Sequence, residues 1–161
     1  MGTPRAHRDG SDEAIDGAAS DGVFDGLLTY RMRRAWLAVQ ADLAETLKPF
    51  DLRMITFSAL VLVEANPRLS QASLARLMAV ERPNLVMIVD ELARRGLIER
   101  NRAPEDRRAY ALDVTEAGRA LCRDAMQAVR AQDARLFRGL DACERRAVEA
   151  AFATLRRSAS P

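Results

Sequence analysis

Apolar residues recur at helical spacing through the first part of the chain. They fall at three- and four-residue steps, a pattern that is typical of a helix with one apolar face. The stripe runs through Phe24, Leu28, Met32, Ala35, Val39 and Leu43 and reaches about Leu47. Lys48 and Pro49 should end this helix, because the residue before a proline is disfavoured in helical backbone.

Two further helices are predicted on either side of a break at Pro67. Residues 56–65 are apolar on nearly all sides, so the first of these helices is expected at the centre of the core. Pro67 ends it, and the Ser70 hydroxyl should cap a short helix that begins at Gln71 and reaches about residue 78. The inward-facing residues of that short helix are predicted to be Leu74 and Leu77.

The segment RPNLVMIVDELARRG predicts a fourth helix. Pro83 is favoured in a first helical turn, and Gly96 is well placed as the carboxyl-terminal stop. One face of this helix is formed by Leu85, Ile88, Val89 and Leu92. We therefore expect that face to be buried.

A change of period follows Gly96 and indicates two short strands. The segments LIER and YALDV are the strand candidates, and the polar residues 101–108 join them as the tip of a hairpin. The second strand alternates, with Tyr110, Leu112 and Val114 on one side. The hairpin is expected to cover part of the core with that side.

The rest of the chain predicts two more helices. Thr115 should cap a fifth helix that extends to about Phe137. The inner face of this helix is expected to comprise Leu121, Cys122, Ala125 and Val129. Asp141 and Glu144 resemble a capping box that opens a final helix to about residue 156.

The composition adds an acidic tail to this picture. Residues 1–22 are rich in Gly, Ala, Ser and Asp and have few large apolar side chains, so we expect them to be disordered. They carry a formal charge of −3, which leaves about +5 on the remainder of a chain whose net charge is +2. Nearly all the positive charge is arginine, which suits contacts with phosphates or base edges. A codon-composition effect is the alternative explanation of this bias, and the one we favour.

Several classes of protein are disfavoured by the sequence. It has no run of about 18 apolar residues and no signal pattern, so we expect a soluble, cytoplasmic protein that does not enter a membrane. Cys122 and Cys143 lack a metal-type spacing and are expected to be small core residues. The sole histidine, His7, lies in the acidic tail, and there is no glycine-rich phosphate loop. We therefore predict no catalytic residue, no metal, no cofactor and no enzyme activity.

Two short helices followed directly by a strand hairpin form the winged helix-turn-helix arrangement, whose second helix fits the major groove of DNA. The segments LSQASLARLMAVERPNLVMIVDELARRGLIER and PEDRRAYALDVTEAG resemble the MarR family of bacterial transcription regulators. The resemblance covers about residues 24–157, and its most specific parts are DELARRGLI and LDVTEAG. It implies a mainly α fold with a small β-hairpin wing.

The resemblance also implies how the chain is organised and what it binds. Residues 23–161 form a single domain, with dimerisation helices at 23–48 and 115–157 and the winged helix-turn-helix at about 54–114. The expected assembly is a homodimer that binds a palindromic operator in double-stranded DNA. It is expected to act as a repressor that is released when a small aromatic acid or its CoA thioester binds.

The family pattern assigns the tip of the hairpin to the minor groove. Arg108 is the residue expected to enter that groove, where narrow A·T-rich stretches have enhanced negative potential. Asp106 should hold its guanidinium by a forked ion pair, and Arg107 should face the phosphates. The alternative is an exposed hairpin with ordinary solvated charges.

The two helices of the motif supply the other candidate DNA contacts. Ser70 and Gln71 begin the helix that crosses the backbone, where free amide groups favour a phosphate, although Ser70 also suits simple capping. The first turn of the recognition helix offers Arg82 for guanine and Asn84 for adenine. The candidates on that helix are Arg82, Pro83, Asn84 and Met87, with Val86 also outward. Pro83 and Met87 depart from the family pattern, so thymine methyls and DNA shape are expected to matter more.

An effector site is expected between the dimerisation helices and the winged module. Arg31 lies on the apolar stripe of the first helix, and it suits a ligand carboxylate or a CoA phosphate. The proposed apolar and aromatic wall comprises Trp36, Met54 and Phe57, and Tyr30 is a further, polar aromatic candidate. Alternatively, the apolar and aromatic residues are core and Arg31 pairs with an acid of the other subunit. Two other functions stay open: a thiol-switch regulator that uses Cys122 or Cys143, and a ligand-independent architectural DNA binder.

Overall fold

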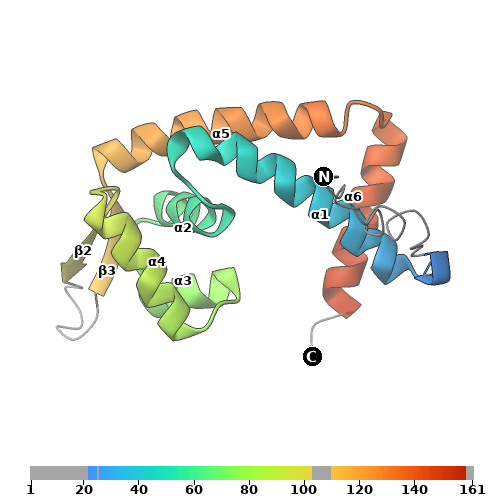
Figure 1. Cartoon of the computed structure of the whole chain (residues 1–161). Helices are drawn as coiled ribbons and strands as arrows, with labels where there is room; N and C mark the ends of the chain where they lie inside the picture. Colours follow the sequence, from blue (N-terminus) through green and yellow to red (C-terminus); the bar gives the residue numbers. More distant parts are fainter. Residues whose placement is uncertain (1–21, 25, 103–109, 159–161) are drawn as a thin grey trace, which may run out of the picture. The chain divides into compact units, whose positions relative to one another are not determined.

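The computed structural model describes residues 22–24, 26–102 and 110–158 (Figure 1). The chain forms two compact units, Met1–Ala38 and Val39–Pro161, and the boundary falls within helix α1 (Leu28–Leu47). The described part of the first unit holds a single turn of 3-10 helix, η1 (Gly22–Phe24), and the beginning of α1. Of the predicted acidic tail, only Gly22 lies within the described residues.

The second unit contains the elements after α1, and the predicted helices are recovered in it. Their bounds are η2 (Lys48–Phe50), α2 (Met54–Ala65), β1 (Leu69–Ser70), α3 (Gln71–Met78), α4 (Arg82–Arg94), β2 (Ile98–Arg102), β3 (Tyr110–Val114), α5 (Glu116–Leu136) and α6 (Ala142–Ser158). The predicted start of the first helix at Phe24 is wrong, because α1 begins at Leu28. Gly26, a poor helix former, separates α1 from the 3-10 turn that contains Phe24. No helix among the described residues is both long and apolar enough to span a bilayer.

The sheet has three antiparallel strands in the order β1-β3-β2, rather than the two strands of the predicted hairpin. In the additional strand, Leu69 pairs with Leu112 and Ser70 with Ala111. A two-residue strand is too short to show alternation in a sequence, which is why β1 was missed. Leu112 and Val114 are buried as predicted, whereas the side chain of Tyr110 lies outside the described residues.

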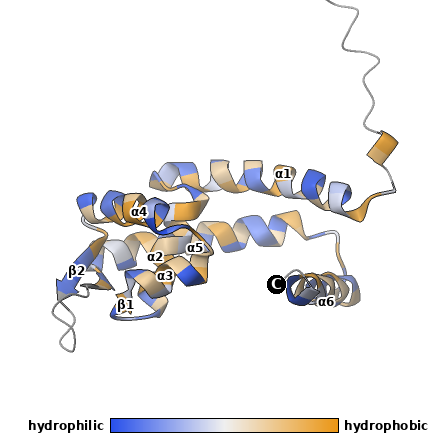
Figure 2. Cartoon of the chain, turned by 90° about the horizontal axis from the view of Figure 1, so that it is seen from below, coloured by the Kyte–Doolittle hydropathy of each residue, from blue (hydrophilic) through white to orange (hydrophobic). Residues whose placement is uncertain are grey.

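The core of the second unit forms around α2, as predicted from its all-round apolar sequence. Figure 2 shows α2 largely in the colour of apolar residues, whereas α4 carries both colours. The predicted inner face of α4 is confirmed: Leu85, Ile88, Val89 and Leu92 are all buried. Leu74 of α3 is also buried, but Leu77 is 57% exposed, so its predicted inward position is wrong. Leu77 lies on the side of α3 that borders an open cavity.

The predicted caps are confirmed by specific hydrogen bonds. The Ser70 hydroxyl accepts a bond of 3.1 Å from the amide of Ser73 at the start of α3. Asp141 and Glu144 form a reciprocal box, in which each backbone amide donates to the other side chain at 2.8 and 2.9 Å. Gly96 follows α4 with a φ of 67°, a left-handed conformation that favours glycine.

Helix α5 buries Cys122 and Ala125 as predicted and half-buries Leu121 and Val129. Cys143, however, is exposed, so its prediction as a core residue is wrong. It lies in the first turn of α6, a helix with no buried residue among those described in the single chain. Large apolar side chains are likewise exposed on α1 and α6: Leu28, Met32, Trp36, Leu37, Phe152 and Leu155.

The joint between the sheet and α5 depends on the absence of a side chain at Gly118. The Thr115 hydroxyl accepts from the amide of Gly118 at 3.0 Å and donates to the carbonyl oxygen of Gly96 at 2.6 Å. This arrangement draws the first turn of α5 against Leu97. A Cβ atom at position 118 would lie 2.0 Å from the carbonyl oxygen of Leu97 and 2.8 Å from the side chain of Val114.

We expect Gly118→Ala to lower the free energy of unfolding by about 3 kcal/mol, because the backbone must move to relieve the overlap. Gly139→Ala is the matched control, since a Cβ atom there meets nothing within 4 Å. That control should change stability by less than about 0.5 kcal/mol in urea titrations followed by circular dichroism. Equal stability of the two variants would contradict the close approach.

Candidate nucleic-acid interface and ligand cavity

The amino-terminal half of α4 presents its predicted DNA contacts to solvent. Arg82, Pro83 and Asn84 are exposed in the first turn. Met87 is 69% exposed one turn later. These side chains point outward because the opposite face of α4 is buried, which fixes the rotation of the helix about its axis. The structure therefore brings these predicted residues together on one exposed face.

The start of α3 adds a polar region beside this face. Ser70 and Gln71 are both half-buried, and the Ser70 hydroxyl is engaged in capping. Arg76 was not predicted; it is exposed, it donates to the Ser73 hydroxyl at 3.1 Å, and with Arg82 it borders a surface groove. Its position as a basic residue in the last turn of α3 was the available signal. A cation there suits contact with a phosphate.

The hairpin of β2 and β3 is attached to α4 and to β1. Arg100 of β2 forms an ion pair with Asp90 of α4. Asp113 of β3 accepts from the amide group of Asn101 at 3.1 Å and from the backbone amide of Arg68 at 2.9 Å. The predicted minor-groove residues Asp106, Arg107 and Arg108 lie outside the described residues.

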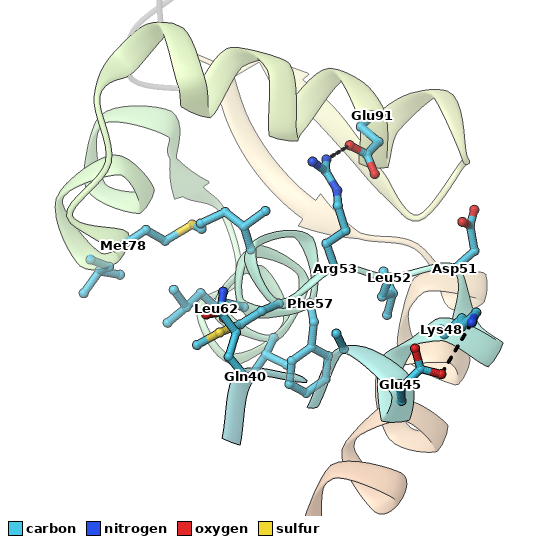
Figure 3. Close-up of a pocket in the computed structure, with 16 residues that line it drawn as sticks. Gln40, Glu45, Lys48, Asp51, Leu52, Arg53, Phe57, Leu62, Met78 and Glu91 are labelled. Atoms are coloured by element: carbon cyan, nitrogen blue, oxygen red, sulfur yellow. Dashed lines mark hydrogen bonds and ion pairs between the residues drawn. The ribbon is translucent and has the colours of Figure 1, made fainter. Parts of the chain in front are cut away.

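A cavity of about 1120 Å³ opens in the second unit between the end of α1, α2, α3 and α4 (Figure 3). Two of the predicted effector residues, Met54 and Phe57, line it. Phe57 is buried, whereas Met54 is 39% exposed. The cavity therefore offers an apolar and aromatic wall that a small ligand could contact.

The other predicted effector residues belong to the first unit. There the ring of Tyr30 stacks on that of Phe24 with 4.8 Å between their centroids. Trp36 is 43% exposed, and Arg31 is exposed on the same helix. The structure thus places Met54 and Phe57 together in the cavity, and it describes Tyr30, Arg31 and Trp36 separately on α1.

Charged residues surround the cavity in pairs. Lys48 lies 3.4 Å from Glu45, and Arg53 forms an ion pair with Glu91 of α4. These two pairs are drawn as dashed lines in Figure 3. Sequence reasoning did not find the second pair, because 38 residues separate its members and no periodicity relates them.

Asp42 holds the end of α1, which forms one side of the cavity, to α5. Its carboxylate accepts from the amide of Gln132 at 2.9 Å and from Arg135 at 2.8 Å. The hydrogen bond from Gln132 is the largest cause that lowers the pKa of Asp42 below its ordinary value of 3.8. Desolvation opposes it, and the hydrogen bond and charge of Arg135 lower the pKa further. Asp42 is therefore a carboxylate at neutral pH, and its contacts with α5 hold the end of α1 in place at that pH.

Cys122 is a buried thiol rather than a reactive one. Burial, together with a hydrogen bond to and the negative charge of Glu64, raises the pKa of Cys122 to about 12. The thiol is therefore protonated at neutral pH, and the thiolate is the form that reacts. No three potential metal ligands among His, Cys, Asp and Glu cluster within the part of the chain that the structure describes.

Comparison with known proteins identifies the family. Residues 50–109 match the model of the MarR family. A proposed transcriptional regulatory protein for the hcr operon of Thauera aromatica is 34% identical over 113 residues, which is 70% of this chain and 68% of that protein.

Solved structures extend the similarity to nearly the whole fold. The transcriptional repressor CouR bound to a 23-mer DNA duplex is 35% identical, with a TM-score of 0.81, over 86% of this chain and 98% of that chain. CouR from Rhodococcus jostii RHA1 bound to p-coumaroyl-CoA is 31% identical, with a TM-score of 0.76, over 86% and 95%.

A mutant of Escherichia coli MarR complexed with operator DNA is 23% identical and has a TM-score of 0.76, over 84% of this chain and 99% of that chain. It shares the fold. These relatives are transcription regulators, which confirms the prediction that the chain is not an enzyme. The outward face of α4 and the antiparallel wing agree with these similarities. The chain belongs to the MarR family of transcription regulators.

Proposed function

We propose that this protein is a cytoplasmic, sequence-specific repressor that binds a palindromic operator as a homodimer. It leaves the DNA when a small aromatic acid or its CoA thioester binds. The observation that carries the proposal is the exposed first turn of α4, held outward by a fully buried inner face. The similarity to a repressor bound to a DNA duplex supports it.

In this proposal α4 reads the major groove. Arg82 forms two hydrogen bonds with guanine and Asn84 with adenine, each contributing about 1–3 kcal/mol of discrimination. Pro83 and Met87 offer apolar contacts instead of hydrogen-bond donors, so they contact thymine methyls and favour particular DNA shapes. Ser70 and Gln71 position α3 on the phosphate backbone.

The wing supplies the minor-groove contact. Arg108 enters the groove, Asp106 orients it, and Arg107 faces the phosphates. The ion pair between Arg100 and Asp90 supports this role, because it joins the base of the wing to α4. Both DNA-reading elements then move together.

Dimerisation involves residues 23–48 and 115–157 around a winged module at about 54–114. The exposed apolar side chains found on α1 and, separately, on α6 support this division of the domain, because exposed apolar surface marks an interface. A two-fold dimer would place two copies of α4 on the two halves of a palindrome. Residues 1–22 remain a proposed disordered acidic tail outside this domain.

The ligand is proposed to occupy the cavity beside α2 and α4. Its volume suits a drug-sized molecule, and Met54 and Phe57 provide an apolar contact. The p-coumaroyl-CoA bound to CouR of Rhodococcus jostii RHA1 supports an aromatic acid or its thioester as the class of ligand. Tyr30, Arg31 and Trp36 are proposed as effector residues from their chemistry alone.

The wing assignment is tested by Arg108→Ala, with Leu92→Ala as a contrasting variant. Loss of the arginine should weaken binding to the DNA upstream of the protein's own gene about tenfold, with an unchanged melting temperature. Leu92 is fully buried, so its truncation should cost about 2–5 kcal/mol of stability. Fluorescence anisotropy and thermal melting measure the two effects, and unchanged affinity of the Arg108 variant would remove that assignment.

The effector proposal is tested by titrating a protein–operator complex with aromatic acids and their CoA thioesters. We expect at least one compound to weaken operator binding about tenfold or more, because it binds the DNA-free conformation more tightly. Random DNA is the control for sequence preference. Equal affinity for random and upstream DNA, with no response to any compound, would favour the architectural alternative.

The thiol-switch alternative is tested with Cys143→Ser, which leaves Cys122 as the only cysteine. We expect iodoacetamide at pH 7.5 to leave Cys122 unmodified in the folded protein, because its pKa is about 12, and to alkylate it after unfolding in urea. Mass spectrometry measures both states. Rapid alkylation of the folded variant, with loss of DNA binding in peroxide, would support a switch at Cys122.

A further inference from the structure

We propose that Arg53 is the anion-recognising residue of the cavity, and that an anionic ligand acts by separating Arg53 from Glu91 of α4. The inference rests on the proposed function, because it names the group of the ligand that is recognised and the contact that its binding breaks. The shared chemistry is an anionic oxygen group. It is the carboxylate of a free acid or a phosphate of a CoA thioester.

The cavity lining includes two cationic residues, and they differ in what they join. Lys48 pairs with Glu45 three residues earlier, and about three quarters of each side chain is exposed. That pair joins the end of α1 to η2, three residues further along the chain, and does not reach α4. Arg53 instead pairs with Glu91 of α4, as Figure 3 shows. Of these two pairs, only the second links the cavity to the recognition helix.

Arg53 combines a fixed backbone with an accessible side chain. The buried Thr56 hydroxyl donates to the carbonyl of Arg53 and accepts from its amide, both at 3.0 Å. The amide of Phe57 donates to the same carbonyl at 2.9 Å. The side chain of Arg53 is nevertheless 68% exposed. A guanidinium has five donors in a planar fork, so this one suits a carboxylate or phosphate that enters the cavity.

Glu91 belongs to a pair of neighbouring acids that connect α4 in two directions. Its side chain is 27% exposed and points to the cavity, whereas Asp90 pairs with Arg100 of the wing. A change at Glu91 therefore acts on the same helical turn that holds the hairpin. This continuity joins the cavity to both proposed DNA-reading elements.

A second attachment keeps the end of α4 in place. Arg95 donates to the backbone carbonyls of Asp51 at 2.5 Å and Phe50 at 3.0 Å, from a side chain that is only 25% exposed. The carboxyl end of α4 thus has a largely covered anchor. The contact of Arg53 with Glu91, one turn earlier on α4, is more accessible, so an anion can replace Glu91 as the partner of Arg53.

The ligand gains its effect from a difference between two states. With DNA bound, Glu91 neutralises Arg53 and holds α4 beside the cavity. When a ligand anion pairs with Arg53, Glu91 is left without that partner and close to a like charge, which disfavours the same position of α4. Ligand and DNA then compete, and the coupling is equal in both directions.

The test compares Arg53→Gln and Glu91→Gln with the wild-type protein. Glu45→Gln is the matched control, because it also removes a carboxylate from the cavity lining but not from α4. The probes are p-coumarate, p-coumaroyl-CoA and the neutral methyl ester of p-coumarate. Calorimetry gives the ligand Kd without DNA, and anisotropy gives the operator Kd with and without ligand.

We expect Arg53→Gln to weaken binding of the charged probe about tenfold, and Arg53→Lys to restore part of it. Glu91→Gln should bind the probe at least as tightly as wild type, yet lose most of the ligand-induced release from DNA. The methyl ester should cause no release. A loss confined to p-coumarate identifies the carboxylate as the recognised group, and a loss confined to the thioester identifies a phosphate.

Normal ligand affinity of the Arg53 variant, or full release of the Glu91 variant, would overturn the inference while the proposed function stands. The inference would also be overturned if Glu45→Gln reduced the ligand-induced release from operator DNA as much as Glu91→Gln does. If no probe weakens operator binding by the wild-type protein, the effector part of the proposed function and this inference both fail. Thermal melting of each variant separates these results from a loss of folding.

Discussion

The packing of four apolar side chains of α4 on the core around α2 is the constraint on which the rest of the structure depends. Leu85 and Leu92 begin and end this contact, and Ile88 and Val89 between them complete the buried side of the helix. Because a helix turns 100° per residue, fixing one side also fixes the opposite one. The direction of Arg82, Asn84 and Met87 is therefore a consequence of core packing.

The helices could be predicted because their signals are local. A helix cap such as Ser70 and a stop such as Gly96 act within a few residues, and periodicity averages over a whole helix. The strand β1 could not be found in the same way, because its two residues acquire their conformation by pairing with β3. The predicted burial of Leu77 and Cys143 was wrong for a related reason: helical spacing of apolar side chains does not reveal whether another element covers them.

The candidate sites were predictable to different extents. The exposed turn of α4 followed from amphipathicity, since residues opposite a buried face must point outward. Arg53 and Glu91 were missed because an ion pair across 38 residues depends on tertiary structure and leaves no pattern in the sequence. The pairing of these two charged residues could therefore be known only from the folded chain.

Two side chains of the proposed interface, those of Pro83 and Met87, have no hydrogen-bond donor. DNA binding would then depend more on the close fit of α4 in the groove. Close contacts weaken with small displacements, so the proposed change at Glu91 would alter DNA affinity through a small shift of α4. An interface that discriminates weakly between bases can thus lose DNA affinity readily when a ligand binds.

The uncovered apolar side chains of α1 and α6 have a consequence for how many molecules a cell must make. If these surfaces are hidden only when two chains associate, the amount of competent repressor at low abundance rises with the square of the chain concentration. Halving synthesis would then remove about three quarters of the active form under dilute conditions. Repression of a gene controlled by this protein would then change more steeply than in proportion to the number of chains synthesised.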